Sequence, residues 1–475
     1  MLTPVPFALS ACAEFSPDGG METVAAIAGD AGGGQVVKLH NDEEIRGAED
    51  RVRQLLRRRR LSANSAVQIA LLNNKGLQAT YNELALSEAK GVEDSLPPSP
   101  SLSLSRLAAS GQLEIEKQIL VNVLGLFTLP KRREIAAVEF RQAQFRAAGE
   151  TLRIIAEAKR AYYRAVASAE TEALMRQSKA SAEAASELTR RLGESGAVAK
   201  LDQAREHVFY AEITGELARA RQTKEADREA LIRVLGLWGA EIKFQLPRRL
   251  PPLQRQPRRK TDIEREALQR RVDVEMARLE VEAIAKRLGL TRATRLVNAL
   301  DVAGKSKYER TTTINDSGGE DVEKTRWHGA EIGIQVPLFD FGEARSRQAE
   351  ETYMQAVNRL AEEAVNARSE VREAYQRYRG AYDFARHYQT EIVPLRQTIA
   401  DESLLRYNGM LTDIFPVLAD ARARIASNKA AIEALRDFWL ADTDLNAALT
   451  GGSSPGAPAE TGAAVLAASG GEAGH

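Results

Sequence analysis

The chain has 475 residues, and its 66 basic and 66 acidic side chains give a formal net charge of zero. This balance gives no support to nucleic-acid binding, which normally shows as a basic surface. The single cysteine, Cys12, excludes an intrachain disulfide, and the five histidines are scattered without metal-ligand spacing. No glycine-rich phosphate loop follows a strand pattern. We therefore expect no enzymatic activity, no cofactor and no metal site.

The first residues suggest processing. The sequence Leu9-Ser-Ala-Cys12 resembles the lipobox of bacterial lipoproteins, in which the cysteine is acylated and becomes the N-terminus after cleavage. Residues 1–12 are then a signal peptide with Cys12 as the lipidation site. No Lys or Arg precedes the short apolar run, which departs from the pattern, and an incidental cysteine is the alternative. Residues 13–60 are Gly-rich, then acidic, then Arg-rich, and predict a disordered or extended lead-in.

The next segments predict a helix, two strands and a long helical hairpin. A helix begins near Ser62, which offers a cap, and ends before Leu96-Pro-Pro-Ser-Pro100. Apolar and polar residues alternate over 101–106 and again over 113–123, which indicates an antiparallel pair of strands. We expect Pro130 to end the second strand. A helix of roughly 60 residues follows, turns near Gly196 and returns to about Leu237.

The second half has the same order. Four prolines over 247–257 predict a linker, because proline disrupts a helix interior. A helix over about 262–288 precedes a strand that contains Leu300 and Val302, a polar loop at 310–325 and a strand that begins at Trp327. Another long helix turns near Gly409, and a last helix reaches about Leu449. The tail, 451–475, is rich in Gly, Ala, Ser and Pro and is expected to be disordered.

An internal repeat of about 210 residues organises the chain, since that interval separates Pro130 from Pro337 and Gly196 from Gly409. We predict a mainly α fold with a small β contribution. A first repeat spans 61–246, a Pro/Arg-rich linker spans 247–260, and a second repeat spans 261–450. Each repeat contains a helix, a β-hairpin and a long helical hairpin.

Four phrases in order resemble the TolC-type outer-membrane efflux proteins, and the resemblance covers about residues 60–449. The phrases are 66–84, which resembles the family's first helix; 196–205 and 407–422, which resemble the two hairpin turns; and Val336-Pro-Leu-Phe-Asp-Phe-Gly342. The chain departs from the family at Lys75-Gly76, where Pro-Glu is usual. The resemblance, of the lipoprotein type, implies a homotrimer with a shared 12-stranded β-barrel and an α-helical tunnel.

The function implied by the resemblance is passive conduction across the outer membrane of a Gram-negative bacterium. Substrates would arrive from an inner-membrane pump and a periplasmic adaptor protein, and outer-membrane lipid would surround the barrel. Two alternatives stay open: a lipid-anchored or soluble coiled-coil scaffold without a pore, and the exit duct of a type I protein secretion system. The sequence does not separate drugs, metal ions and proteins as cargo.

The resemblance also places candidate site residues. The two hairpin turns would form the periplasmic constriction and contact the adaptor, through Gly196, Asp202, Gly409, Asp413 and Phe415. Both glycines are expected at positive φ. Pro416 and Ala419 stand where the family carries gating aspartates, and helix capping accounts equally well for Asp202 and Asp413. Tyr308 and Trp327 are expected as aromatic residues at the membrane interface.

Overall fold

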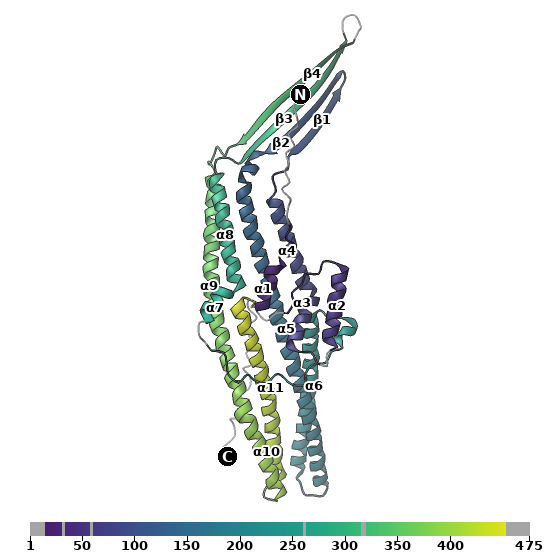
Figure 1. The fold of residues 1–475 in the computed structure, drawn as a ribbon. Coiled ribbons are helices and arrows are strands. Elements are labelled where there is room, and N and C mark those ends of the chain that lie inside the picture. Colours follow the sequence, from purple (N-terminus) through teal and green to yellow (C-terminus); the bar gives the residue numbers. More distant parts are fainter. Residues whose placement is uncertain (1–14, 31–33, 58–59, 260–262, 315–319, 453–475) are drawn as a thin grey trace.

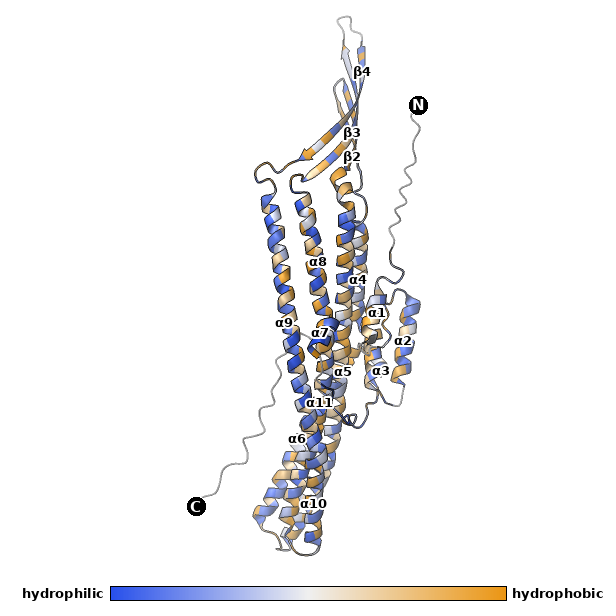
Figure 2. Cartoon of the chain, turned by 60° about the vertical axis from the view of Figure 1, so that its left-hand side comes forward, coloured by the Kyte–Doolittle hydropathy of each residue, from blue (hydrophilic) through white to orange (hydrophobic). Residues whose placement is uncertain are grey.

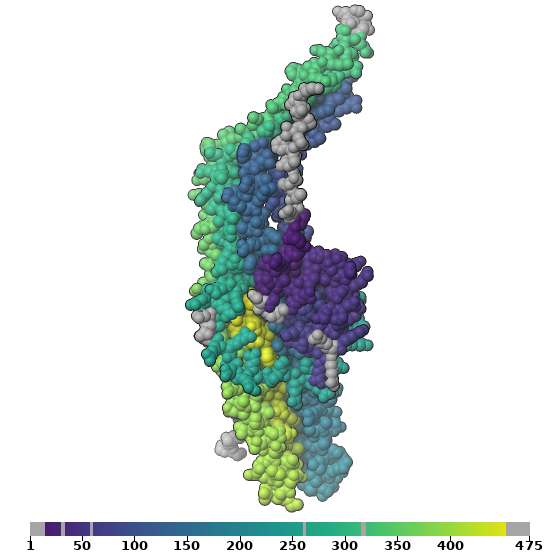
Figure 3. Space-filling view, viewed as in Figure 1, coloured from purple at the N-terminus to yellow at the C-terminus, as the bar shows by residue number. Residues whose placement is uncertain are grey.

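The computed structural model describes residues 15–30, 34–57, 60–259, 263–314 and 320–452. The molecule is elongated, with the four-stranded sheet at one end and the tips of the α5–α6 and α10–α11 hairpins at the other (Figure 1). The N-terminal part of the chain, purple in Figure 3, bulges from one side at mid-height. The fold is mainly helical with one small antiparallel sheet, as the sequence predicts.

The sheet is an antiparallel meander in the order β1-β2-β3-β4. Its strands are β1 (Ser101–Ala109), β2 (Gln112–Asn122), β3 (Ala299–Ile314) and β4 (Glu320–Gln335). The β2–β3 contact joins the two repeats, because Gln112 pairs with Thr311 and Asn122 pairs with Asp301. The register runs without a bulge, so alternate residues of all four strands share one face.

The first repeat contains α3 (Ala63–Asn73), α4 (Lys75–Asp94), α5 (Val123–Glu194) and α6 (Lys200–Leu235), with η1 (Gly239–Ile242) after them. The expected first helix is thus two helices, divided at Asn74. Asn74 ends α3 with ψ 111 and caps α4, because its side chain accepts a hydrogen bond from the Leu77 N–H at 3.1 Å. Ser62 caps α3 as the sequence predicts.

The second repeat contains α7 (Ile263–Arg270), α8 (Val272–Ala293), α9 (Glu343–His387), α10 (Val393–Asn408) and α11 (Ile414–Thr450). A π-helical turn, η2 (Tyr388–Ile392), joins α9 to α10. The predicted helix over 262–288 is divided at Arg271, whose ψ of 122 is extended. The Arg271 guanidinium is buried and bonds Asp273, Glu370 and the Ala448 carbonyl, so this break anchors α8 to α9 and α11. The order of elements therefore repeats, which confirms the predicted two-fold repeat.

Three boundaries differ from the predictions. The lead-in at 13–60 contains α1 (Met21–Asp30) and α2 (Asp42–Leu56), which fold because Val24 and Val52 are buried in the main core. Pro130 lies inside α5, which begins at Val123 with Asn122 as its cap. A proline there removes one hydrogen bond near the start of a 72-residue helix that many other contacts support. The polar segment at 310–325 is mostly strand, since β3 continues to Ile314 and β4 begins at Glu320.

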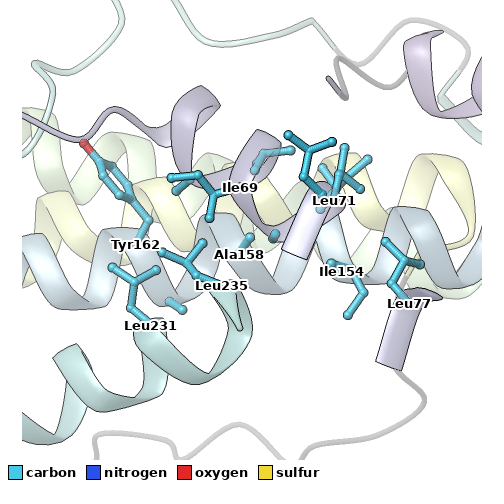
Figure 4. Packing of buried hydrophobic residues seen from close by; sticks show 14 of the residues in the cluster. Ile69, Leu71, Leu77, Ile154, Ala158, Tyr162, Leu231 and Leu235 are labelled. Carbon is cyan, nitrogen blue, oxygen red and sulfur yellow. The ribbon is translucent and has the colours of Figure 1, made fainter. Parts of the chain in front are cut away.

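Two of the three hydrophobic clusters in the described residues are large. The larger packs α1, α2, α3, α4 and α6 with α5 and includes Ile69, Leu71, Ala158, Tyr162 and Leu235 (Figure 4). The second packs α7, α9 and α11 around Phe438. Tyr163 of α5 stacks on Trp439 of α11 with ring centroids 5.2 Å apart, so the clusters are continuous across the two repeats.

The linker is irregular where the structure describes it, up to residue 259, and it is packed against the helices. The Trp439 indole donates to the Pro251 carbonyl at 3.0 Å, and the Tyr382 hydroxyl donates to the Arg255 carbonyl at 3.0 Å. These bonds satisfy backbone groups that a helix would otherwise pair. The predicted tail at 451–475 lies outside the described residues apart from residues 451 and 452, and so does Cys12.

Candidate functional site

The turn of the first hairpin joins α5 to α6 through Gly196. Gly196 has φ +78, as the sequence predicts. Its N–H donates to the Gly193 carbonyl at 3.0 Å, and the next N–H, of Ala197, donates to the Leu192 carbonyl at 2.9 Å. This left-handed position favours glycine, because other residues meet a steric penalty there.

The turn of the second hairpin corrects one expectation. Gly409 has φ −81, so it does not need the freedom of glycine. The left-handed residue is Met410, with φ +57 and a side chain that is 93% exposed. The Met410 N–H donates to the Tyr407 carbonyl at 3.0 Å and the Leu411 N–H donates to the Arg406 carbonyl at 2.9 Å, which repeats the pattern of the first turn. Met410 is therefore the structural counterpart of Gly196.

The acidic residues at the tips differ in their partners. Asp202 lies in the first turn of α6 and pairs with Arg205 at 3.1 Å. Asp413 occupies the cap position of α11, yet its side chain makes no capping hydrogen bond and is exposed. Phe415, in the first turn of α11, is half-buried. Of the two aspartates, Asp413 is thus the one with its carboxylate free at the tip.

The sequence did not predict an ion pair that links the two hairpins above their tips. The Arg422 guanidinium of α11 donates to the Glu206 carboxylate of α6 at 2.6 Å, and Arg422 also lies over the Phe209 ring at 4.2 Å. The Glu206 side chain is only 5% exposed. The signal in the sequence is that Glu206 and Arg422, an acid and a base, follow the hairpin turns at similar positions in the two repeats. This pair holds the hairpins of the two repeats together.

The sheet has two faces of opposite character, which the register assigns. One face, here called the acidic face, contains Lys305 and Lys307 with the acids Glu114, Glu116, Asp301, Glu309, Asp321, Glu323 and Glu331. Lys307 pairs with Glu114 at 3.0 Å, and Lys305 pairs with Glu331. The charges of both lysines are thus neutralised by carboxylates on neighbouring strands.

The other face, here called the apolar face, is hydrophobic near the helices. Its residues there are Leu102, Ile119, Val121, Leu300, Val302, Ile332 and Ile334. Several are exposed, including Leu102 at 76% and Ile332 at 67%. Hydrophobic and hydrophilic patches accordingly alternate along the strands (Figure 2). Such a sheet suits apolar surroundings on one side and water on the other.

The two aromatic residues predicted at the membrane interface lie on opposite faces. Tyr308 pairs with Arg326 and Ile115 on the apolar face, whereas Trp327 pairs with Lys307 on the acidic face. The Arg326 guanidinium lies 5.7 Å from the centre of the Tyr308 ring, which supports this assignment. Tyr308 and Trp327 therefore do not belong to one aromatic girdle, because neighbouring strand positions alternate in direction.

The chain combines a two-faced sheet with long helical hairpins. Part of its sequence also matches a known protein family. Residues 264–452 match the family model of the outer membrane efflux proteins. The matched part of the chain, which contains most of the second repeat, resembles this family. No curated protein sequence shows significant similarity to it. Among the described residues, no helix is both long and apolar enough to cross a membrane.

Solved structures share the fold of this chain. CusC matches with a TM-score of 0.68 and 15% identity over 82% of this chain and 92% of CusC. VceC of Vibrio cholerae matches with a TM-score of 0.67 and 16% identity over 82% and 96%. The MtrE channel of Neisseria gonorrhoeae matches with a TM-score of 0.65 and 16% identity over 82% and 89%. At these identities the likeness establishes the fold.

Proposed function

We propose that this protein is the outer-membrane channel of a tripartite efflux system. It would conduct substrates passively from an inner-membrane pump and a periplasmic adaptor protein to the cell exterior. The observation that carries the proposal is the division of the sheet into an apolar and an acidic face. A sheet that faced water on both sides would have no reason to expose Leu102, Ile119 and Ile332 on one face.

The edges of the sheet support a trimer. β1 and β4 each pair with one strand only in the described sheet. Unpaired strand edges attract other strands, and β4 is 16 residues long. Three chains that joined β1 of one copy to β4 of the next would close a 12-stranded β-barrel, with the apolar face outward and the acidic face lining the lumen.

The hairpin tips, at the end of the molecule away from the sheet, are our candidates for the constriction and the adaptor contact. Leu411 is 79% exposed beside the exposed Met410, so the second tip offers apolar surface to a partner. The free Asp413 carboxylate of each copy would narrow the pore with negative charge. Gly196, Asp202, Gly409 and Phe415 complete the two tips in this proposal.

Lipid anchoring through Cys12 fits the position of the first described residues. The Ser16 N–H donates to the Glu88 carboxylate at 2.6 Å, which holds this segment on α4. Glu88 lies six residues before the end of α4, or about 9 Å along the helix. Four extended residues reach at most about 14 Å. Cys12 would therefore be able to reach the end of α4 that faces the sheet.

The test is ion selectivity in planar bilayers. We expect a conductance that favours cations, because carboxylates line the lumen. The double variant Glu116→Gln with Glu323→Gln should lower the cation preference. The matched double variant Arg106→Gln with Arg326→Gln changes the other face and should leave the preference unchanged. Absence of conductance in detergent-extracted, trimeric protein would contradict the proposal and favour a scaffold without a pore.

A further inference from the structure

The apolar face of the sheet carries a band of basic residues in the half farther from the helices. The band consists of Arg106, Lys117, Arg310, Lys324 and Arg326, and we call it the basic belt. Among described strand residues, Glu320 at the far end of β4 is the only acid on this face. The acidic face has the opposite balance. The two faces thus segregate charge of opposite sign as well as polarity.

The belt occupies three neighbouring cross-strand rows. The middle row runs across all four strands as Arg106, Ile115, Tyr308 and Arg326. The row nearer the helices contains Lys117 with Ser306 and His328, and the row farther out contains Arg310 with Lys324. The rows between the belt and the helices contain only uncharged residues.

The distance of the belt from the helix end of the sheet is close to the height of the apolar band that a membrane barrel presents to lipid. Tyr308 lies eight residues from Leu300 along β3, which is about 27 Å at the usual rise of a strand. With the usual barrel tilt this is roughly 20 Å of height. The exposed rings of Phe127 and Phe339 extend the apolar surface at the helix end. The total approaches the band of about 25 Å that membrane barrels present to lipid.

The belt lacks internal partners, unlike the lysines of the other face. Arg106, Lys117, Arg310 and Lys324 are exposed, and no carboxylate among the described residues pairs with them. Arg326 lies over the Tyr308 ring and likewise pairs with no carboxylate among the described residues. Cations at the middle of a lipid-facing surface are costly, whereas near the interface the cost falls to almost nothing. Their partner therefore has to come from the interface itself.

We propose that the basic belt binds the phosphate groups of the lipids in the outer leaflet of the outer membrane. This inference rests on the proposed function, because it needs the apolar face to point outward. Guanidinium groups match phosphate oxygens with paired hydrogen bonds, and Arg106 and Arg326 stand in the same row. The bound phosphates would fix the height of the barrel in the membrane.

The experiment measures lipid retained by the purified, detergent-extracted protein. The parent protein is incubated with diphosphoryl lipid A, or with neutral phosphatidylcholine, washed, and analysed for bound lipid by mass spectrometry. The parent should retain lipid A in preference to phosphatidylcholine. Arg106→Gln with Arg326→Gln should lower lipid A affinity about five-fold for each cation removed. The control, Lys305→Gln with Lys307→Gln, removes the same charge from the other face and should retain lipid A fully.

Equal retention by the parent and the Arg106→Gln/Arg326→Gln variant would overturn the inference, as would an equal loss in the control. Conductance of the same preparations separates this outcome from failure of the proposed function. Conducting protein without a lipid A preference refutes the belt alone. Protein that neither conducts nor prefers lipid A refutes the channel and the belt together. Retained conductance in the Arg106→Gln/Arg326→Gln variant also shows that it has folded.

Discussion

Gly196 and Met410 occupy the same position in the turns of the two hairpins, with φ angles of +78° and +57°. In both turns the N–H of this residue bonds the carbonyl three residues earlier, and the following N–H bonds the carbonyl five residues earlier. The second repeat thus places a side chain where the first has none, and that side chain projects from the tip.

The turns give the first prediction. Met410→Gly should stabilise the second hairpin by about 1 kcal/mol, because a left-handed conformation costs other residues roughly this much. Gly196→Ala should destabilise the first hairpin by a similar amount. Gly409→Ala is the matched control, since φ −81 suits alanine, and should change stability by less than about 0.5 kcal/mol. Thermal unfolding and limited proteolysis at the tips measure these effects; a larger loss at Gly409 than at Gly196 would contradict the assignment.

Asp413 gives the second prediction, which rests on the proposed constriction. Asp413→Ala should raise single-channel conductance, or antibiotic leakage in cells, because it removes an unpaired carboxylate from the tip of each copy. Asp202→Ala should have a smaller effect, since Arg205 already pairs with Asp202. Unchanged conductance for Asp413→Ala in bilayers would remove Asp413 from the constriction.

Asp442 gives a prediction on pH. Burial raises the pKa of Asp442 above its ordinary value of 3.8, although Arg258 and Lys159 oppose this shift. The folded protein then holds the proton to higher pH than the unfolded chain does. The contribution of Asp442 to the free energy of unfolding therefore falls as pH rises from the ordinary to the raised pKa.

Asp442→Asn should remove this part of the pH dependence. Melting temperatures from about pH 3 to pH 7 would show a smaller fall for Asp442→Asn than for the parent. Asp437→Asn, on the same helix but exposed, is the charge-matched control and should follow the parent. A pH profile of Asp442→Asn that coincides with that of the parent would show that Asp442 is not the group responsible.

The two aromatic residues of the sheet give the fourth prediction. Brominated acyl chains quench indoles that touch lipid. Tyr308→Trp should add fluorescence that such lipids quench, because this position lies on the apolar face. Trp327→Phe should remove none of the quenchable fluorescence, because Trp327 lies on the acidic face with Lys307. Strong quenching of Trp327 would reverse the assignment of the faces.

Local patterns predicted the repeat, the strand alternation and the Ser62 cap, because these depend on neighbouring residues. They did not predict α1 and α2, whose apolar residues are buried against other helices, those of α1 against α5 and those of α2 against α3. The helix break at Arg271 depends likewise on Glu370 and Ala448, far along the chain.

At the candidate site, spacing located both turns and both strands of each hairpin. Spacing could not show which residue of the second turn has positive φ. The hydrogen-bond pattern of the turn places Met410 at this position, although Gly409 stands next to it. Spacing also could not show which faces of the different strands lie on the same side of the sheet. Only the register between β2, β3 and β4 separates Tyr308 from Trp327 and gathers the basic belt.

The most direct test of the channel is the native mass of the protein extracted by detergent from fractionated cells. We predict an outer-membrane species of three 52.0 kDa chains, roughly 156 kDa. A soluble dimer, or a monomer that only acyl chains hold on the membrane, would contradict the channel and favour a coiled-coil scaffold.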